Sequence, residues 1–281
     1  MNMQRELSQI IKGLPVSDGD GVQLTRIIGG AELNMLDPFL LLDAFGSDKP
    51  QDYIGGFPAH PHRGFETVTY MLDGKMRHED SAGNAGVIEA GGVQWMTAGK
   101  GIIHSEMPEQ SKGLLSGFQL WLNLPAQYKM TPPKYQERTS SEIQIESFGK
   151  SSSIKVIAGK TLQGTEGVIE SDFVAPVYWD IEQSENDHFS QALPHNHNAF
   201  IYVIEGQLKI GNKASLLSEK HLGVLTVGDS IQIEATKNSR YLLIAGKPIN
   251  EKVERAGPFV MNTKQQLQQA FLDYQNGNLT A

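Results

Sequence analysis

Short strand-and-turn segments that occur twice in this chain constrain its fold more than any other feature. Tyr70–Gly74 is echoed by Tyr202–Gly206, and each is an apolar run that ends in an acidic residue and a glycine. In the same way, Gly86–Gly91 is echoed by Gly223–Gly228. Apolar runs that end in such residues are typical of strands joined by tight turns. Their repetition in the two halves predicts a duplicated β-barrel or sandwich unit.

The rest of the chain agrees with two β-rich halves. Further strands are predicted where short apolar runs lie between glycines and polar turns. The predicted strands cover residues 65–72, 86–88, 94–97, 118–122, 154–158, 174–179, 200–204, 208–210, 230–233 and 241–245. Two adjacent prolines with polar neighbours indicate a linker over Pro125–Glu137. We therefore expect an all-β fold of two antiparallel β-barrel domains, over residues 1–137 and 138–281.

One helix is predicted near the C-terminus. Thr263 and Gln266 have the spacing of a capping box, in which two residues satisfy each other's backbone N–H groups. Gly277 stands where a glycine commonly ends a helix. Between them, four residues with helical spacing form one apolar face: Leu267, Ala270, Phe271 and Tyr274. We expect this helix to cover a barrel surface in a structural role.

Two pairs of residues with metal-ligand chemistry lie in the first half. His60 and His62 are separated by one residue, and so are His104 and Glu106. Because alternate residues of a strand point to one face, each pair presents both side chains to one side of a sheet. Neighbouring strands would bring three imidazoles and a carboxylate together, a ligand set for a divalent transition metal. The alternative for the first pair is two hydrogen-bonded histidines at a sheet edge, which Pro61 also fits.

Composition narrows the classes of function. The chain has no cysteine, which excludes disulfides, zinc ribbons and thiol catalysis and leaves histidine and carboxylate as metal ligands. Its net charge of −8 disfavours direct nucleic-acid binding, since phosphate contacts need basic side chains. The first residues lack the apolar core of a signal peptide, and no apolar run is long enough to span a membrane. We expect a cytoplasmic monomer without a membrane or nucleic-acid partner.

Longer stretches around the two ligand pairs resemble a known family. Gly56–Thr69 closely resembles the first signature of the pirin family, a branch of the cupin superfamily, and Gln94–Met107 resembles its second. Leu36–Asp43, Leu120–Pro125 and Gly257–Thr263 are also similar to this family. The likeness therefore covers nearly the whole chain. It implies a bicupin, with two antiparallel β-barrels and one mononuclear metal in the N-terminal barrel.

The resemblance also implies which residues bind the metal. His60, His62, His104 and Glu106 match the family's ligand positions. Iron(II) is the expected ion, with zinc, manganese, nickel, cobalt and copper as alternatives. Glu66 has the spacing of the carboxylate ligand of other cupins, but pirins take their carboxylate from the second motif. We expect Glu66 to orient an imidazole without binding the metal, the alternative being an ordinary strand carboxylate.

A second His-x-His sequence, His195 and His197, lies in the other half. His62 precedes Gly74 by twelve residues, whereas His197 precedes Gly206 by nine, and no His-x-Glu follows in the corresponding region. We therefore expect the C-terminal barrel to be metal-free and these two histidines to be exposed loop residues. Three other histidines lack partners at ligand spacing and are expected on the surface or in the core: His78, His188 and His221.

Since some bacterial pirins are quercetinases, the resemblance implies a flavonol 2,3-dioxygenase. Such an enzyme cleaves a ring of the flavonol with O₂ and releases carbon monoxide, and Glu106 is the expected base for the flavonol 3-hydroxyl. A flat aromatic substrate requires apolar walls. Five large side chains in or beside the motifs are substrate-pocket candidates, with a place in the barrel core as the alternative for each: Phe57, Phe65, Trp95, Met96 and Trp121.

The alternative function is a non-catalytic iron-binding regulator, whose affinity for a protein partner follows the oxidation state of the metal. Animal pirins act as iron-dependent transcriptional co-regulators, and some bacterial ones are reported to bind metabolic enzymes. Oxidation of iron adds one charge and could reshape the nearby surface. The sequence offers this alternative little support, because basic residues near the site are few: Arg63, Lys75, Arg77 and Lys100.

Overall fold

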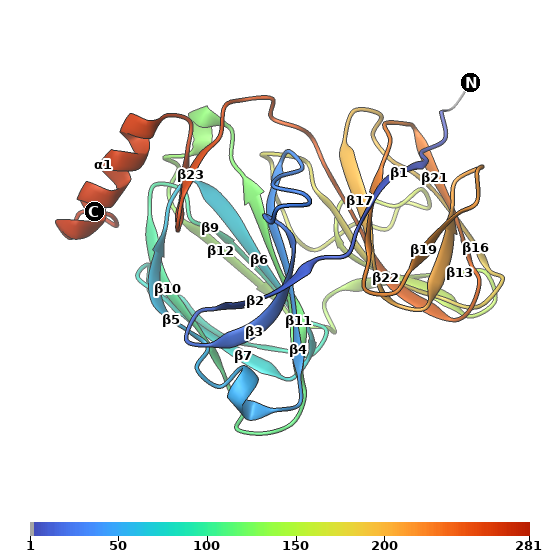
Figure 1. Ribbon diagram of the computed structural model, residues 1–281, viewed down its shortest axis with the longest axis horizontal. Helices are drawn as coiled ribbons and strands as arrows, with labels where there is room; N and C mark the ends of the chain where they lie inside the picture. The colour runs from blue at the N-terminus through green and yellow to red at the C-terminus, as the bar shows by residue number, and fades with distance from the viewer. Residues whose placement is uncertain (1–2) are drawn as a thin grey trace. The chain divides into compact units, whose positions relative to one another are not determined.

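The computed structural model describes residues 3–281, which form antiparallel sheets and one α-helix (Figure 1). The chain folds into two compact units, each with a seven-stranded and a four-stranded sheet. We call one unit the N-terminal barrel; it contains Leu14–Gly29, Phe39–Ser140 and Ile249–Ala281. The other, the C-terminal barrel, contains residues 3–13, Gly30–Pro38 and Ser141–Pro248. This architecture confirms the predicted all-β bicupin with a C-terminal helix.

The N-terminal barrel holds most of the strands of the first half. They are β2 (Leu14–Asp18), β3 (Val22–Ile28), β4 (Phe39–Ser47), β5 (Phe57–His62), β6 (Phe65–Asp73), β7 (Lys75–Asp80), β8 (Ala85–Glu89), β9 (Val93–Thr97), β10 (Ile102–Pro108), β11 (Leu115–Asn123) and β12 (Lys134–Arg138). The sheet orders are β12-β9-β6-β11-β4-β3-β2 and β5-β10-β7-β8. Two short 3₁₀ helices, a hairpin and a helix complete the unit: η1 (Pro50–Asp52), η2 (Ala126–Tyr128), β23 (Glu254–Ala256), β24 (Phe259–Met261) and α1 (Lys264–Gln275).

The C-terminal barrel combines a strand from the start of the chain with the second half. Its strands are β1 (Leu7–Ile11), β13 (Gln144–Phe148), β14 (Ser152–Ala158), β15 (Val177–Gln183), β16 (His188–Ala192), β17 (Asn198–Glu205), β18 (Gln207–Ile210), β19 (Ser215–Ser218), β20 (Leu222–Leu225), β21 (Ser230–Ala235) and β22 (Ser239–Gly246). The sheet orders are β1-β20-β17-β22-β15-β14-β13 and β16-β21-β18-β19. Every predicted strand overlaps one of the observed strands.

The sheets of the two barrels correspond strand by strand, which confirms the predicted duplication. Tyr70–Gly74 and Tyr202–Gly206 join equivalent strands, because β6 leads into β7 as β17 leads into β18. The second predicted repeat is wrong by one strand. Gly86–Gly91 begins on β8, whereas Gly223–Gly228 begins on β20, whose counterpart is β9. Short apolar runs before a glycine look alike on either strand, so the pattern could not distinguish them.

Both barrels include segments that are distant in sequence. β1 pairs with β20 and takes the edge place in the C-terminal barrel that β12 takes in the N-terminal barrel. The last segment, Ile249–Ala281, belongs to the N-terminal barrel. The compact units are thus interleaved along the chain. The domain boundary that we predict between residues 137 and 138 stays a prediction.

The predicted linker over Pro125–Glu137 is wrong in its second part. Lys134–Arg138 forms β12, an edge strand that pairs with β9, and Gln136 is buried opposite Trp95. The segment is mostly polar, so it lacks the apolar alternation by which strands are recognised. An edge strand with few buried side chains therefore cannot be recognised by its hydrophobic pattern.

The predicted helix is confirmed in its bounds and its caps. The Thr263 side chain accepts a hydrogen bond from the backbone of Gln266, whose own side chain accepts one in return, and Gly277 has a positive φ of 73°. Leu267 and Ala270 are buried and pack with apolar residues of the β23–β24 hairpin. In Figure 1, α1 lies beside β23. This packing agrees with the structural role expected for the helix.

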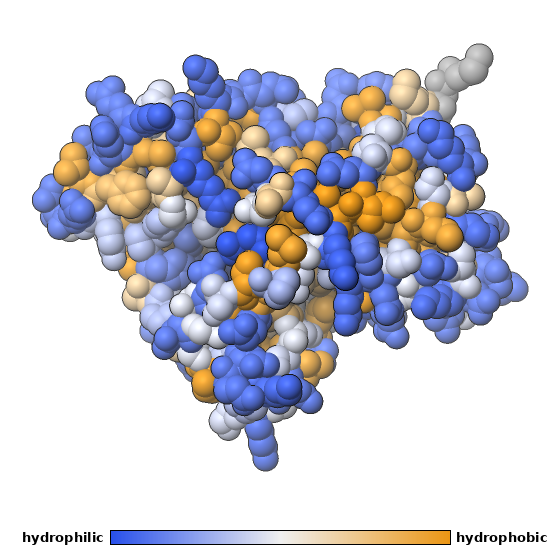
Figure 2. Space-filling model, in the orientation of Figure 1, coloured by the Kyte–Doolittle hydropathy of each residue, from blue (hydrophilic) through white to orange (hydrophobic). Residues whose placement is uncertain are grey.

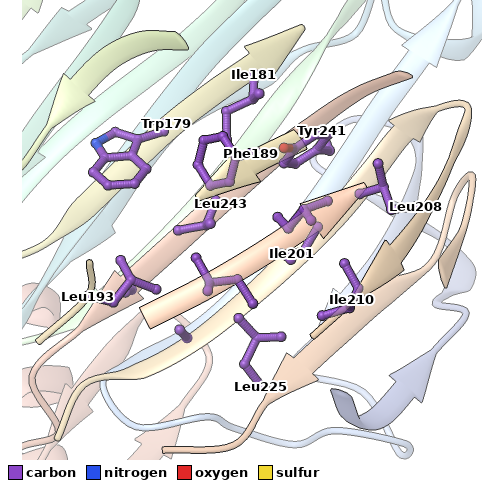
Figure 3. Close-up of a cluster of buried hydrophobic side chains, with 14 of the residues drawn as sticks. Trp179, Ile181, Phe189, Leu193, Ile201, Leu208, Ile210, Leu225, Tyr241 and Leu243 are labelled. Atoms are coloured by element: carbon purple, nitrogen blue, oxygen red, sulfur yellow. The ribbon is translucent and has the colours of Figure 1, made fainter. Parts of the chain in front are cut away.

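The interior of the C-terminal barrel is filled by apolar side chains (Figure 3). Phe189 on β16 and Ile231 and Ile233 on β21 pack against residues of the facing sheet such as Trp179 and Ile201. β16 and β21 correspond to β5 and β10 of the N-terminal barrel, which carry the predicted metal ligands. The duplicated framework therefore carries apolar side chains on this pair of strands in one barrel and histidines on the equivalent pair in the other.

Hydrophilic side chains cover most of the face drawn in Figure 2, with apolar groups scattered between them. Over residues 3–281, no helix is both long and apolar enough to cross a membrane.

Candidate metal centre

Two neighbouring strands of the four-stranded sheet bring three of the predicted ligands together. His60 and His62 lie on β5, an edge strand, which agrees with Pro61 between them, and His104 lies opposite His60 on β10. One ring nitrogen of each histidine lies within 4.8 Å of the other two. In residues 3–281 this is the one group of three or more histidine and carboxylate ligands.

Backbone carbonyls fix the proton positions of the β5 histidines. Nδ1 of His60 lies 2.8 Å from the carbonyl oxygen of Pro58, and Nδ1 of His62 lies 3.2 Å from that of Pro258. Because a carbonyl oxygen only accepts, Nδ1 carries the proton in both rings and Nε2 keeps a lone pair. The two Nε2 atoms are 3.0 Å apart, so both lone pairs face the same region.

His104 is oriented by a buried relay that sequence analysis missed. Its Nδ1 lies 3.4 Å from Nδ1 of His78, whose Nε2 lies 3.1 Å from Oδ2 of Asp80. Asp80 accepts further hydrogen bonds from the backbone of Ala82 and from Asn84. With one proton on Nε2 of His78 and one on Nδ1 of His104, His78 donates to Asp80, and His104 donates to Nδ1 of His78. Nε2 of His104 is then left buried without a hydrogen-bond partner in the described chain, which suits a metal ligand.

Burial favours the neutral form of these imidazoles. It lowers the pKa of His62 well below the usual value, and the positive charge that His60 can carry lowers it further. Burial also lowers the pKa of His104, with smaller contributions from His62, His60 and His78. Hydrogen bonds from Asn84 and His78 outweigh burial and hold the pKa of Asp80 below its usual range. Since a metal ligand must be unprotonated, these shifts favour His62 and His104 as metal ligands.

The two glutamates near the cluster are held by threonines. Glu106 on β10 is buried, and its Oε1 accepts a 2.5 Å hydrogen bond from Thr69. It lines the same cavity as His60 and His62 but is outside the three-histidine group, so its role as a fourth ligand stays a prediction. Glu66 accepts a 2.7 Å hydrogen bond from Thr97. Its orienting role also stays a prediction.

The cluster lies at one side of a cavity of about 560 Å³ in the N-terminal barrel. Phe57 and Trp121 line this cavity, together with Leu24, Leu41 and Phe45. The other three pocket candidates are buried and do not line it: Phe65, Trp95 and Met96. Phe65 instead packs against Trp121, with ring centroids 4.4 Å apart. Side chains that alternate along a strand reach opposite faces, and the motif alone did not show which face borders the cavity.

Glycines allow the backbone to turn sharply beside the ligands. Gly64, between β5 and β6, has a φ of 90°, and an added Cβ would lie 2.0 Å from the carbonyl oxygen of Val260. Gly101, before β10, has a φ of 150°, and its Cβ would lie 2.3 Å from that of Leu279. Only glycine fits such positions. A glycine turn therefore precedes the strand that carries His104.

The histidines of the second His-x-His sequence lie on the loop between β16 and β17. His195 is exposed, and its Nδ1 lies 2.9 Å from Asp229. The prediction that His197 is exposed is wrong, because its ring is buried and burial lowers its pKa to about 4. His188 and His221 are at the surface or partly buried.

The basic residues near the site are engaged elsewhere. Arg63 is buried and pairs with Asp273 at 2.6 Å. The other three bind a carboxylate or the C-terminal residue on the surface: Lys75, Arg77 and Lys100. Arg26 on β3 lines the cavity, and so does Arg255 on β23, which sequence analysis also overlooked. The position of Arg255 depends on a hairpin far along the chain, for which the sequence offered no local signal.

Comparison with known proteins agrees with this architecture. Residues 21–122 match the family model for pirin, and residues 178–280 match that for the pirin C-terminal cupin domain. A pirin-like protein of Caulobacter vibrioides is 49% identical over 97% of this chain and 98% of its own length. Human pirin is 41% identical over 98% of this chain and 94% of its own.

A solved structure is similar over the same extent. The crystal structure of quercetin 2,3-dioxygenase from Acinetobacter baumannii has a TM-score of 0.91, is 32% identical and covers 99% of both chains. The two family models, the extent of the sequence identity and the bicupin fold agree with one another. The chain therefore belongs to the pirin family.

Proposed function

We propose that this protein is a metal-dependent flavonol dioxygenase of the quercetin 2,3-dioxygenase type. The observation that carries the proposal is a group of three histidine nitrogens, within 4.8 Å of one another, beside a cavity with apolar walls. A protein of similar fold is named quercetin 2,3-dioxygenase, which supports the same reaction class. Iron(II) is the ion we propose for the site, because three imidazoles with a nearby carboxylate suit it and leave positions for substrate and O₂.

His60, His62 and His104 would hold the metal through Nε2. Their Nδ1–H groups face Pro58, Pro258 and His78, which keeps the rings in the tautomer and orientation that binding needs. When bound, a divalent metal supplies Lewis acidity, which lowers the pKa of a hydroxyl group that coordinates it.

Glu106 is the residue we propose as the base. It borders the cavity, and the hydroxyl of Thr69 holds one of its carboxylate oxygens. The second oxygen would accept the proton of the flavonol 3-hydroxyl. Removing this proton concentrates electron density on the ring that O₂ cleaves, with carbon monoxide and a phenolic ester as the products. A base in hydrogen-bond reach contributes roughly 10²- to 10⁴-fold to rate.

The apolar walls would bind the flat rings of the substrate. Phe57 and Trp121 offer aromatic surfaces, and Leu24, Leu41 and Phe45 extend them. The cavity volume of about 560 Å³ lies in the range of pockets for drug-sized ligands. These walls also limit the water near the reacting group, which strengthens the electrostatic effect of Glu106.

The test is turnover of quercetin by iron-loaded protein, followed by O₂ uptake and carbon monoxide release. Glu106→Gln should retain iron but lose turnover at least about a hundredfold, because the amide cannot accept the proton. Glu109→Gln is the matched control, since Glu109 pairs with Arg77 on the surface. Normal turnover in the Glu106 variant would remove the residue from the base role. Failure of the iron-loaded wild type to release carbon monoxide would overturn the proposed function.

A further inference from the structure

The wall of the metal cavity carries two arginines, and only one of them is neutralised. Arg26 donates to both oxygens of Asp43 at 3.0 and 2.8 Å and to Asp18 at 2.8 Å. Two carboxylates thus surround a single guanidinium, whose planar fork they match. Arg26 has little capacity left for a ligand.

Arg255 lines the same cavity but differs from Arg26 in its hydrogen-bond partners. Its Nη1 donates to the carbonyl oxygen of Leu40 at 3.1 Å, and across residues 3–281 no carboxylate oxygen lies within 4.0 Å of the guanidinium. A guanidinium has five N–H donors, so most of those on Arg255 face the cavity or solvent. Of the two arginines in the cavity wall, Arg255 is therefore the one available to bind an anion.

The guanidinium is held in place before any ligand arrives. Its Cζ lies over the ring of Trp121, 4.7 Å from the centroid, and Phe65 packs against the same indole. A positioned charge loses less conformational entropy on binding than a mobile one.

The same hairpin connects this charge to the metal cluster. Arg255 lies on β23, and three residues later the carbonyl of Pro258 fixes the ring of His62. Trp121 bridges the two, since its ring lies 5.2 Å from the imidazole of His62. A ligand bound at the cluster and extending along Trp121 would therefore reach the guanidinium.

We propose that Arg255 selects substrates with a second anionic group. The substrate class is a flat aromatic chelator, bound to the metal through hydroxyl oxygens at one end and carrying a carboxylate or acidic phenol at the other. This inference rests on the metal cavity of the proposed function but not on the dioxygenase reaction itself. Arg26 pairs with both Asp18 and Asp43 and offsets one of their two negative charges, which reduces their repulsion of the anion.

Binding of two matched probes to zinc-loaded protein tests the proposal without turnover. Catechol and 3,4-dihydroxybenzoate chelate a metal through the same two oxygens, but only the latter has a carboxylate. Calorimetry should find 3,4-dihydroxybenzoate bound about tenfold more tightly or more, as expected for a charge-assisted hydrogen bond. In Arg255→Met this preference should disappear while catechol affinity changes little, and Arg255→Lys should retain part of it.

Arg77→Met is the matched control, because Arg77 is paired with Glu109 on the surface of the same barrel. An equal preference in the wild type and Arg255→Met would overturn the proposal, as would the absence of any preference in the wild type. If neither probe binds zinc-loaded protein, the cavity does not accept aromatic chelators, which overturns both this proposal and the substrate class of the proposed function. If the wild type prefers 3,4-dihydroxybenzoate over catechol but does not turn over quercetin, only the dioxygenase reaction is refuted.

Discussion

At the scale of single residues, the geometry of His104 depends on two side chains that cannot themselves reach the cluster centre. His78 stacks on Tyr135, with ring centroids 4.9 Å apart, and its edge joins His104 to Asp80. All hydrogen-bonding atoms of this relay are buried, so no water competes for them. A fixed partner behind a ligating imidazole sets its tautomer and raises its basicity.

Removing His78 should therefore weaken metal binding without unfolding the barrel. We expect His78→Phe to lower the affinity for iron(II) roughly 10- to 100-fold, because the ring keeps its stacking but loses both hydrogen bonds. Anaerobic titration against a competing chelator measures the effect, and circular dichroism checks the fold. His188→Phe, on the surface of the other barrel, should bind iron normally. Equal affinities in the two variants would show that the relay does not support His104.

At the scale of elements, the β23–β24 hairpin is tied to the barrel by a buried lysine. Nζ of Lys129 donates to the carbonyl oxygens of Gly64 and Val260 and to the side chain of Asn123, at 2.8, 3.1 and 2.6 Å. Burial lowers the pKa of Lys129 to about 7. At pH 6 the ammonium form supplies one N–H for each of the three acceptors.

Loss of this amine should destabilise the N-terminal barrel. In Lys129→Met three buried oxygens lose their donor, and we expect the free energy of unfolding at pH 6 to fall by about 3 kcal/mol or more. Denaturant unfolding measures this change. The control is Lys75→Met, which breaks only an exposed pair with Glu89 and should cost less than about 1 kcal/mol. A similarly small effect in both variants would mean that the acceptors find other donors.

The elements also show how far the sequence alone could predict this site. The three-histidine group follows from alternation along β5 and β10, a local rule that needs only the two strands to be neighbours. The contact between His78 and His104 could not be predicted, because it depends on the register between β7 and β10. The side-chain direction of Glu106 is likewise set by Thr69 on another sheet. Interactions between elements distant in sequence leave no local pattern.

At the scale of the whole molecule, the start of the chain is fastened to the C-terminal barrel by one buried arginine. Arg5 is fully buried and donates to five backbone carbonyl oxygens at 2.8 to 3.3 Å. These belong to the loops that flank β17 and β21: Pro194, His195, His197, Thr226 and Gly228. β1, which follows Arg5, then pairs with β20 as an edge strand. The order of these loops therefore depends on Arg5, which lies at least 189 residues earlier in the sequence.

Arg5→Met should accordingly affect one barrel and spare the other. The carbonyl oxygens would lose a donor in a site closed to water, and we expect a stability loss of about 3 kcal/mol or more in the C-terminal barrel. Calorimetry should then resolve an earlier unfolding transition, while iron(II) affinity at 25 °C stays unchanged, because the three-histidine group lies in the N-terminal barrel. Lys12→Met, at an exposed position of the same segment, should leave both properties unaltered. A parallel loss of iron affinity in Arg5→Met would contradict this separation and would mean that order in the C-terminal barrel is required for the metal site.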